Sequence, residues 1–325
     1  MTKVNDTVPV LSIKDLRTYF YAHEGVGKAV DGVSYHVFRG ETLGVVGESG
    51  CGKSVTALSI LRLIPSPPGK IVSGEIIFEG QNLLDLPLDK MREIRGNHIS
   101  MIFQEPMTSL NPVFAIGSQL SKVFILHQNL SKKAAKKRSI EMLEACEIPS
   151  PERIMREYPH QLSGGMRQRV MIAMALGCNP EVLIADEPTT ALDVTIQAQI
   201  LDLILRLKSE FGMAMILITH NLGIVAKAAR RVVVMYAGEK VEEADVSSLF
   251  ERPRHPYTIA LMNSIPVRGR SEKFLEEIKG VVPTPYRSIL GCKFADRCPE
   301  AMERCQRERP QLKETGKGHL VACFH

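Results

Sequence analysis

The stretch Gly47-Glu48-Ser49-Gly50-Cys51-Gly52-Lys53-Ser54 decides the fold of this 325-residue chain. It fits the phosphate-loop pattern G-x-x-x-x-G-K-[ST] at every position. The residues before it, Leu43 to Val46, are typical of a short buried strand, and the apolar stretch from Val55 to Ile64 has the length of a helix. A strand, a glycine-rich loop and a helix in this order predict a phosphate-binding site.

The residue types of this loop suit a nucleotide polyphosphate. Glycines let the backbone curl so that successive N–H groups point at one anion, and the helix N-terminus adds partial positive charge. Lys53 can reach the β- and γ-phosphates, and the Ser54 hydroxyl can bind Mg²⁺. The predicted nucleotide-binding residues of the loop are Gly47, Ser49, Gly50, Cys51, Gly52, Lys53 and Ser54.

The composition indicates an ordinary globular protein, with 44% hydrophobic and 24% charged residues. A net charge of +5 is too small to require nucleic acid as a partner. The first ten residues lack the apolar core of a signal peptide, and no apolar run approaches the roughly 20 residues that cross a bilayer. We therefore expect a cytosolic chain whose membrane role, if it has one, depends on a partner.

Strands and helices alternate after the loop, which predicts an α/β fold with a mostly parallel sheet covered on both faces. Apolar strands are expected at 99–103, 181–186, 213–219 and 231–236, and helices at 165–177 and 196–207. Residues 105–162 are helical and polar, as in an inserted subdomain. Their basic run, 132–138, predicts a solvated helix face, with attraction to an anionic membrane as the alternative. After about residue 248 proline becomes frequent and strands are no longer expected, so we place a domain boundary near Glu251.

Two further motifs accompany the loop. Asp186 ends an apolar strand, where it can bind Mg²⁺ through water, and Glu187 follows as a candidate general base for the attacking water. Ser163-Gly164-Gly165 opens the helix that ends near Gly177, with Ser163 as its N-cap. A helix N-terminus of this kind favours a phosphate, although on its own the motif is better explained as an ordinary capped helix start.

The order of these motifs resembles the ATP-binding subunit of ABC transporters, from Val10 to about Leu249. The resemblance implies a P-loop NTPase fold of the ABC type, with a RecA-like core, an antiparallel β-subdomain and a helical subdomain at about 105–178. It also implies ATP and Mg²⁺ as cofactors. Ser54, Gln104 and Asp186 would contact the Mg²⁺, and Glu187, His220 and Gln104 would serve hydrolysis. Phe20, with Tyr19 as the competing choice, would stack on adenine. Ser163, Gly164 and Gly165 would bind the γ-phosphate held by the opposite subunit, and Asp193 would lie at the dimer interface.

Such a subunit would pair head-to-tail with a second ABC ATPase, either a copy of itself or a paralogue. The family further implies two transmembrane permease subunits, an extracytoplasmic peptide-binding receptor, no nucleic acid, and a peripheral place on the cytoplasmic face of the membrane. A soluble ABC ATPase acting on nucleic acid or ribosomes is the alternative. That class usually carries two nucleotide domains or a coiled-coil insertion, whereas this chain has one phosphate loop and no heptad run.

The C-terminal segment, residues 251–325, indicates which group of ABC transporters the chain resembles. His255-Pro256-Tyr257-Thr258, and the later stretch from Gly291 to Pro299, are similar to the extension of dipeptide, oligopeptide and nickel importers. The likeness to the dipeptide importer subunit makes di- or oligopeptides the expected cargo, with nickel as the alternative. We therefore expect a nucleotide-binding domain at 1–250 and a small Cys-rich extension at 251–325.

Four of the seven cysteines, Cys292, Cys298, Cys305 and Cys323, lie in this segment. Their spacing lacks the tight C-x₂₋₄-C pair typical of structural zinc, and an iron–sulfur cluster, zinc, disulfides and free thiols remain open on spacing alone. The resembled peptide importers carry a [4Fe–4S] cluster on this motif. The resemblance therefore implies a structural [4Fe–4S] cluster here.

Overall fold

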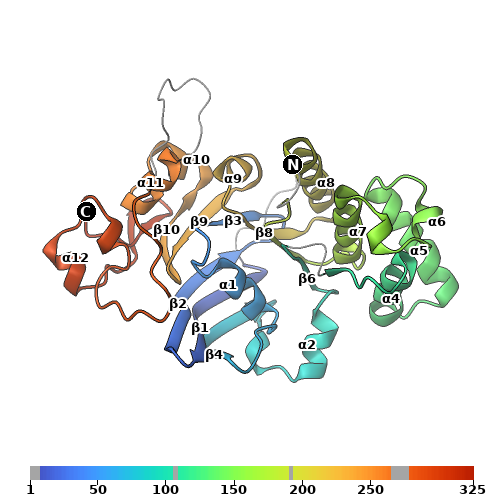
Figure 1. Cartoon of the computed structure of the whole chain (residues 1–325), viewed down its shortest axis with the longest axis horizontal. Coiled ribbons are helices and arrows are strands. Elements are labelled where there is room, and N and C mark those ends of the chain that lie inside the picture. The colour runs from blue at the N-terminus through green and yellow to red at the C-terminus, as the bar shows by residue number, and fades with distance from the viewer. Residues whose placement is uncertain (1–7, 105–108, 190–192, 265–277) are drawn as a thin grey trace. The chain divides into compact units, whose positions relative to one another are not determined.

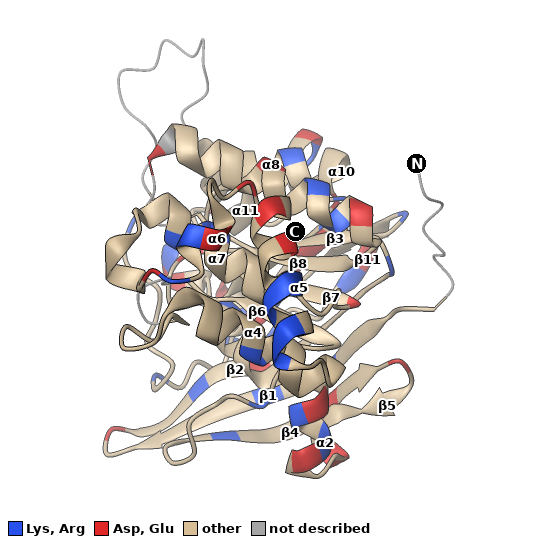
Figure 2. Cartoon of the chain, turned by 90° about the vertical axis from the view of Figure 1, so that its right-hand side faces the viewer, with Lys and Arg blue, Asp and Glu red and all other residues tan. Residues whose placement is uncertain are grey.

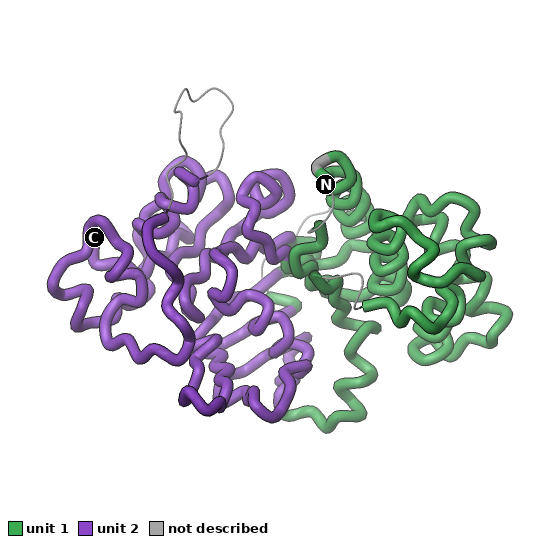
Figure 3. The backbone as a smooth tube through the Cα atoms, viewed as in Figure 1, with its two compact units in different colours: residues 1–10, 38–41, 85–216 green, residues 11–37, 42–84, 217–325 purple. Residues whose placement is uncertain are grey.

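The computed structural model describes residues 8–104, 109–189, 193–264 and 278–325 (Figure 1). The chain divides into two compact units (Figure 3). Unit 1 comprises residues 1–10, 38–41 and 85–216, and unit 2 comprises residues 11–37, 42–84 and 217–325. The chain crosses between the units five times, and the last two crossings fall within a 3₁₀ turn, Leu83–Asp85, and within strand β8, Ala214–Ile218. None of the helices among the described residues is long and apolar enough to span a membrane.

Unit 1 consists of helices around a parallel strand pair. Strand β6 (Ile99–Ile102) pairs in parallel with β7 (Val182–Asp186), and both are fully buried. Parallel strands that are covered on both faces consist mostly of apolar residues, and in these two strands only Ser100 and Asp186 are polar. The helices are α2 (Leu88–Ile94), α4 (Ile116–Gln128), α5 (Lys132–Ala145), α6 (Pro151–Ile154), α7 (Gly164–Leu176) and α8 (Val194–Phe211), with a 3₁₀ turn at Pro159–Gln161.

Short polar side chains start three of these helices. Ser131 accepts a hydrogen bond from Ala134 N at the start of α5, Ser163 from Met166 N at α7, and Asp193 from Ile196 N at α8. Helix α8 ends at Gly212, whose φ of 67° is left-handed and favours glycine. The predicted cap at Ser163 and the predicted stops at Gly177 and Gly212 are confirmed.

The basic run lies on α5, where Figure 2 shows Lys and Arg positions along the helix. Lys132, Lys133, Lys136 and Lys137 are all exposed. Arg138 and Lys137 pair with Glu141 on the same helix. The prediction of a solvated helix face is therefore confirmed.

Unit 2 contains an antiparallel sheet in the order β2-β1-β4-β5. Its strands are β1 (Leu11–Ala22), β2 (Gly25–Val37), β4 (Gly69–Phe78) and β5 (Gln81–Asn82). The long β1 pairs with β2 on one side and with β4 on the other. This sheet is the antiparallel β-subdomain that the resemblance implies.

The remaining strands of unit 2 flank the strand that leads into the phosphate loop. Strand β3 (Thr42–Val46) pairs in parallel with β9 (Arg231–Tyr236), followed in antiparallel order by β10 (Glu239–Asp245), β12 (His319–Val321) and β11 (Lys313–Gly316). The expectation that strands end before the C-terminal segment is wrong, because β12 pairs with β10. The helices of unit 2 are α1 (Lys53–Ile60), α9 (Leu222–Ala228), α10 (Val246–Glu251), α11 (Pro256–Asn263) and α12 (Glu303–Arg307), with a 3₁₀ turn at Ala295–Arg297.

Aromatic side chains attach the C-terminal segment to β9. The ring of Tyr236 lies 4.6 Å from that of Tyr257 and 5.2 Å from that of Phe294, centroid to centroid. All three residues belong to one buried hydrophobic cluster that also includes residues of β3, β9 and β10. Contacting aromatic rings contribute both buried area and favourable edge-to-face geometry.

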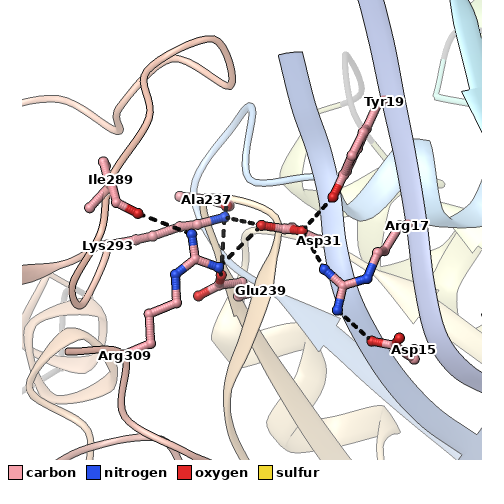
Figure 4. A network of polar contacts seen from close by, with 9 residues as sticks. All are labelled: Asp15, Arg17, Tyr19, Asp31, Ala237, Glu239, Ile289, Lys293 and Arg309. Carbon is pink, nitrogen blue, oxygen red and sulfur yellow. Dashed lines mark hydrogen bonds and ion pairs between the residues drawn. The ribbon is translucent and has the colours of Figure 1, made fainter. Parts of the chain in front are cut away.

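A charged network adds a second attachment (Figure 4). The buried carboxylate of Asp31 in β2 faces Lys293 and Arg309 of the C-terminal segment, and both cations also pair with Glu239. On its other side Asp31 accepts hydrogen bonds from Arg17 and from the Tyr19 hydroxyl. Burial raises the pKa of Asp31, but the Tyr19 hydrogen bond and the two cations outweigh it and lower the pKa to about 2.

Candidate functional site

Glycines at three positions shape the phosphate loop between β3 and α1. Gly47, Gly50 and Gly52 have φ angles of 150°, 80° and 100°. A Cβ atom at Gly47 would lie 2.2 Å from the Met235 carbonyl oxygen, and one at Gly52 would lie 2.3 Å from the Ala29 carbonyl oxygen. Both positions therefore need glycine for backbone conformation and for space.

Lys53, the first residue of α1, points back into this loop. Its Nζ donates to the carbonyl oxygens of Gly47 at 2.8 Å and Glu48 at 2.9 Å. The side chain lies among buried residues, so its positive charge is concentrated inside the curl of the loop. A Cβ at Gly50, in contrast, would meet open space. A curled loop with an inward ammonium group and open space at Gly50 fits the phosphates of a nucleotide.

The predicted acidic residues lie at the carboxyl end of β7 in unit 1. Asp186 is 4% exposed and ends the strand, and Glu187 follows with a left-handed φ of 45°. Gln104, two residues beyond the end of the adjacent β6, donates from Nε2 to Glu187 Oε2 at 3.2 Å. Non-glycine residues with this backbone conformation are uncommon and often lie at functional sites.

The start of α7 is open to solvent. Ser163 is exposed, and Gly164 and Gly165 form the first turn of the helix. A Cβ at Gly165 would lie 3.3 Å from Ile196 on α8, so the glycine allows the two helices to approach closely. Asp193 caps α8, and the three residues before it, 190–192, lie outside the described residues.

Three further predicted residues lie on unit 2 outside the loop itself; the residue before one of them, Thr219, donates its N–H to the Val45 carbonyl oxygen in the strand that leads into the loop. His220 is exposed and follows β8. Phe20 and Tyr19 are half-buried neighbours on β1, so their side chains point to opposite faces of the strand. The Tyr19 hydroxyl donates to Asp31 at 2.8 Å, which ties its ring to the charged network.

Two residues near the loop were not identified from the sequence. Tyr257 and Arg297 both contact Glu48, which occupies an unspecified position of the loop pattern. They lie 209 and 249 residues further along the chain, so no local spacing connects them to it. The only signal in the sequence was that both belong to stretches singled out for family likeness.

The predicted iron–sulfur cluster is wrong, and so is the metal site of the Cys-rich extension. Cys292, Cys298, Cys305 and Cys323 do line one small pocket, together with His255 and Phe324. The described part of the chain nevertheless contains no group of three or more His, Cys, Asp or Glu side chains that could hold a metal ion. Burial raises the pKa of the Cys292 thiol to about 11 and also raises that of Cys298, so both are neutral thiols in this structure. All four are free thiols.

Comparisons with known sequences match two regions of the chain. A profile of the family described as "ABC transporter" matches residues 30–190, and one described as "Oligopeptide/dipeptide transporter, C-terminal region" matches residues 241–305. Among similar proteins, the probable peptide ABC transporter ATP-binding protein y4tR of Sinorhizobium fredii is 56% identical over 97% of this chain and 94% of its own length. The oligopeptide transport ATP-binding protein AppD of Bacillus subtilis is 53% identical over 97% and 96%. Neither name mentions an iron–sulfur cluster.

The fold also matches a solved structure. The ATP-binding cassette MJ0796, in a dimeric post-hydrolysis state bound to ADP and Pi, superposes with a TM-score of 0.65 at 28% identity. The match covers 73% of this chain and 98% of that one. The predicted ABC-type nucleotide-binding fold is therefore confirmed.

Proposed function

This chain belongs to the ATP-binding subunits of peptide-importing ABC transporters, and from that premise we propose how its residues bind and hydrolyse ATP to power uptake. The observation that carries the proposal is the co-occurrence, in one chain, of a complete phosphate loop and a peptide-transporter C-terminal region. The chain hydrolyses ATP, and this hydrolysis powers peptide transport.

The phosphate loop and Lys53 bind the ATP phosphates. The two carbonyl bonds that hold Lys53 in the loop support this role, because they fix its ammonium group where an anion would enter. Ser54 and Asp186 bind Mg²⁺, which neutralises charge on the β- and γ-phosphates when bound. Phe20 stacks on the adenine ring. The Tyr19 hydroxyl donates a hydrogen bond to Asp31, which holds the Tyr19 ring in the charged network. This supports Phe20, rather than Tyr19, as the residue that stacks on adenine.

Glu187 accepts a proton from the attacking water. Gln104 orients the Glu187 carboxylate and this water molecule. The 3.2 Å hydrogen bond between Gln104 and Glu187 supports this pairing, because an amide donor can hold the carboxylate in place while leaving it ionised. His220 donates a hydrogen bond to the γ-phosphate. Exposed positions at the ends of strands, such as that of His220, leave side chains accessible to a ligand.

A second ATPase subunit completes each site. The exposure of Ser163 and the glycine pair behind it support contact of this helix end with the γ-phosphate held by the opposite subunit. Asp193 lies at the same dimer interface. The dimer, made of two copies or of this chain and a paralogue, binds two permease subunits at the cytoplasmic face of the membrane and serves a peptide-binding receptor on the other side.

Residues 1–250 form the nucleotide-binding domain, with the helical subdomain at 105–178, and residues 251–325 form the extension. Di- and oligopeptides are the proposed cargo. To test this, the tagged chain is purified from detergent-solubilised membranes, its associated permeases and ATPase are identified by mass spectrometry, and the complex is reconstituted in vesicles with its receptor. We expect peptides to stimulate ATP hydrolysis. Stimulation by Ni²⁺ but not by peptides would contradict the proposed cargo.

A further inference from the structure

Glu48 in the phosphate loop is bonded to the C-terminal segment through both its backbone and its side chain. Its backbone N–H donates to the Tyr257 hydroxyl oxygen at 2.8 Å. Its carboxylate accepts one hydrogen bond from each terminal nitrogen of Arg297, at 2.7 Å and 2.9 Å. Its carbonyl oxygen accepts from Lys53 Nζ at 2.9 Å. Glu48 therefore links the C-terminal segment directly to the lysine of the phosphate site.

Arg297 is held rigidly at this position. Its side chain is 5% exposed, whereas that of Glu48 is 28% exposed. Nε donates to the Lys279 carbonyl oxygen at 3.0 Å, and one terminal nitrogen also donates to the Tyr236 hydroxyl at 3.3 Å. The guanidinium lies 5.7 Å from the Tyr236 ring centroid and 6.0 Å from that of Phe294. A planar fork fixed in this way is suited to bind one carboxylate in one orientation.

The negative charge of Glu48 affects how the phosphate loop binds an anion. A carboxylate in a loop that binds a polyphosphate repels the ligand unless a cation neutralises it. The loop's own cation, Lys53, is bonded to backbone carbonyl oxygens rather than to this carboxylate. Arg297 is the residue bonded to the Glu48 carboxylate, and it comes from outside the nucleotide motifs.

We propose that Arg297 is a positioning residue for ATP binding, which holds and neutralises the Glu48 carboxylate so that the phosphate loop accepts the nucleotide. Tyr257 assists by fixing the backbone N–H of the same residue. The C-terminal segment thereby sets the ATP affinity of this subunit. The inference rests on the proposed binding of ATP phosphates by residues 47–54.

The test is a double-mutant cycle on the full-length chain, with the Kd for ATP measured by calorimetry. Arg297→Gln leaves the Glu48 carboxylate unpaired. We expect the Kd for ATP to rise about tenfold, because the hydrogen bonds between two charged groups are lost. Arg297→Lys keeps the charge but not the fork, and we expect a rise of about threefold. In the double variant Glu48→Gln/Arg297→Gln the repelling charge is gone, so the Kd should return to within about twofold of wild type.

Arg304→Gln is the matched control, because Arg304 belongs to the same segment but pairs with Glu308 at the surface. It should leave the Kd unchanged. Circular dichroism identifies the variants that fold. The inference is overturned if either folded single variant, Arg297→Gln or Arg297→Lys, binds ATP with the wild-type Kd, or if the double variant binds no better than Arg297→Gln. Loss of ATP binding by Lys53→Ala tests the phosphate site separately, so a failure of this inference is distinguishable from a failure of the proposed function.

Discussion

Gln104 and Glu187 meet just beyond the carboxyl ends of two adjacent parallel strands, with the amide of Gln104 donating to the carboxylate of Glu187 at 3.2 Å. The two residues are 83 positions apart in the chain. Their contact follows from the register of β6 and β7, in which Ile102 pairs with Ala185. A carboxylate that is oriented by an amide in this way is suited to accept a proton from a water molecule.

Substitution of Glu187 should separate ATP binding from hydrolysis. Glu187→Gln keeps the size of the side chain and removes its basicity, so we expect the Kd for ATP to stay within about twofold while turnover falls by about 100-fold or more. Phosphate release and equilibrium binding measure the two quantities. Glu181→Gln, immediately before the first residue of β7, is the control and should turn over normally. Wild-type turnover by Glu187→Gln would show that another group is the base.

Substitution of Lys53 should act on binding itself. Lys53→Ala removes the ammonium group held in the loop by Gly47 and Glu48. We expect the Kd for ATP to rise by about 30-fold or more, because a charge-assisted contact with phosphate is lost. Equilibrium dialysis with labelled ATP gives the measurement. Lys70→Ala, an exposed lysine of β4, should bind as wild type does. Equal affinities for both variants would contradict the role of Lys53.

Mixed dimers test whether the start of α7 acts across an interface. Neither Lys53→Ala nor Ser163→Arg subunits alone should hydrolyse ATP, because each lacks one half of every site. A dimer with one subunit of each kind retains one intact composite site, so mixing should restore part of the activity. Mixtures that dimerise without regaining any activity would count against action in trans. If the chain pairs only with a paralogue, the same substitutions are divided between the two partners.

The buried His255 predicts a loss of stability in mild acid. Its Nδ1 accepts the backbone N–H of Tyr257 at the start of α11, and burial lowers its pKa to about 4, against partial opposition from Glu242. Between about pH 4 and 6.5 the unfolded chain binds more protons at this residue than the folded chain does, so stability falls as the pH falls through this range. We expect about 2 kcal/mol to be lost between pH 7.5 and pH 5. Urea unfolding of His255→Asn, which keeps a capping acceptor but does not titrate, should lack this component; an identical pH dependence in the variant would exclude His255 as its source.

The nucleotide motifs were predictable because each is local. The loop, the acid at the end of β7 and the cap at Ser163 are short runs in which residue type and backbone geometry determine each other. Strand β10 was not predicted, because its sequence contains the adjacent acids Glu242 and Glu243, both of which are buried. Glu243 pairs with Lys240 on the same strand and with Arg231 on β9, and Glu242 contacts His319, which lies 77 residues further along the chain. The clustered cysteines led to a wrong prediction of a metal site. Their spacing in the sequence does not show whether the thiols are buried.

The bonds between Glu48 and the C-terminal segment can form only late in the synthesis of the chain. Tyr257 and Arg297 leave the ribosome 209 and 249 residues after Glu48. At about 5–20 residues per second, the nascent phosphate loop spends on the order of ten seconds or more without either partner. A chain released early, before Arg297, carries every nucleotide motif but leaves the Glu48 carboxylate uncompensated. On the proposed role of Arg297, a chain that ends before this residue binds ATP more weakly than one that extends past it.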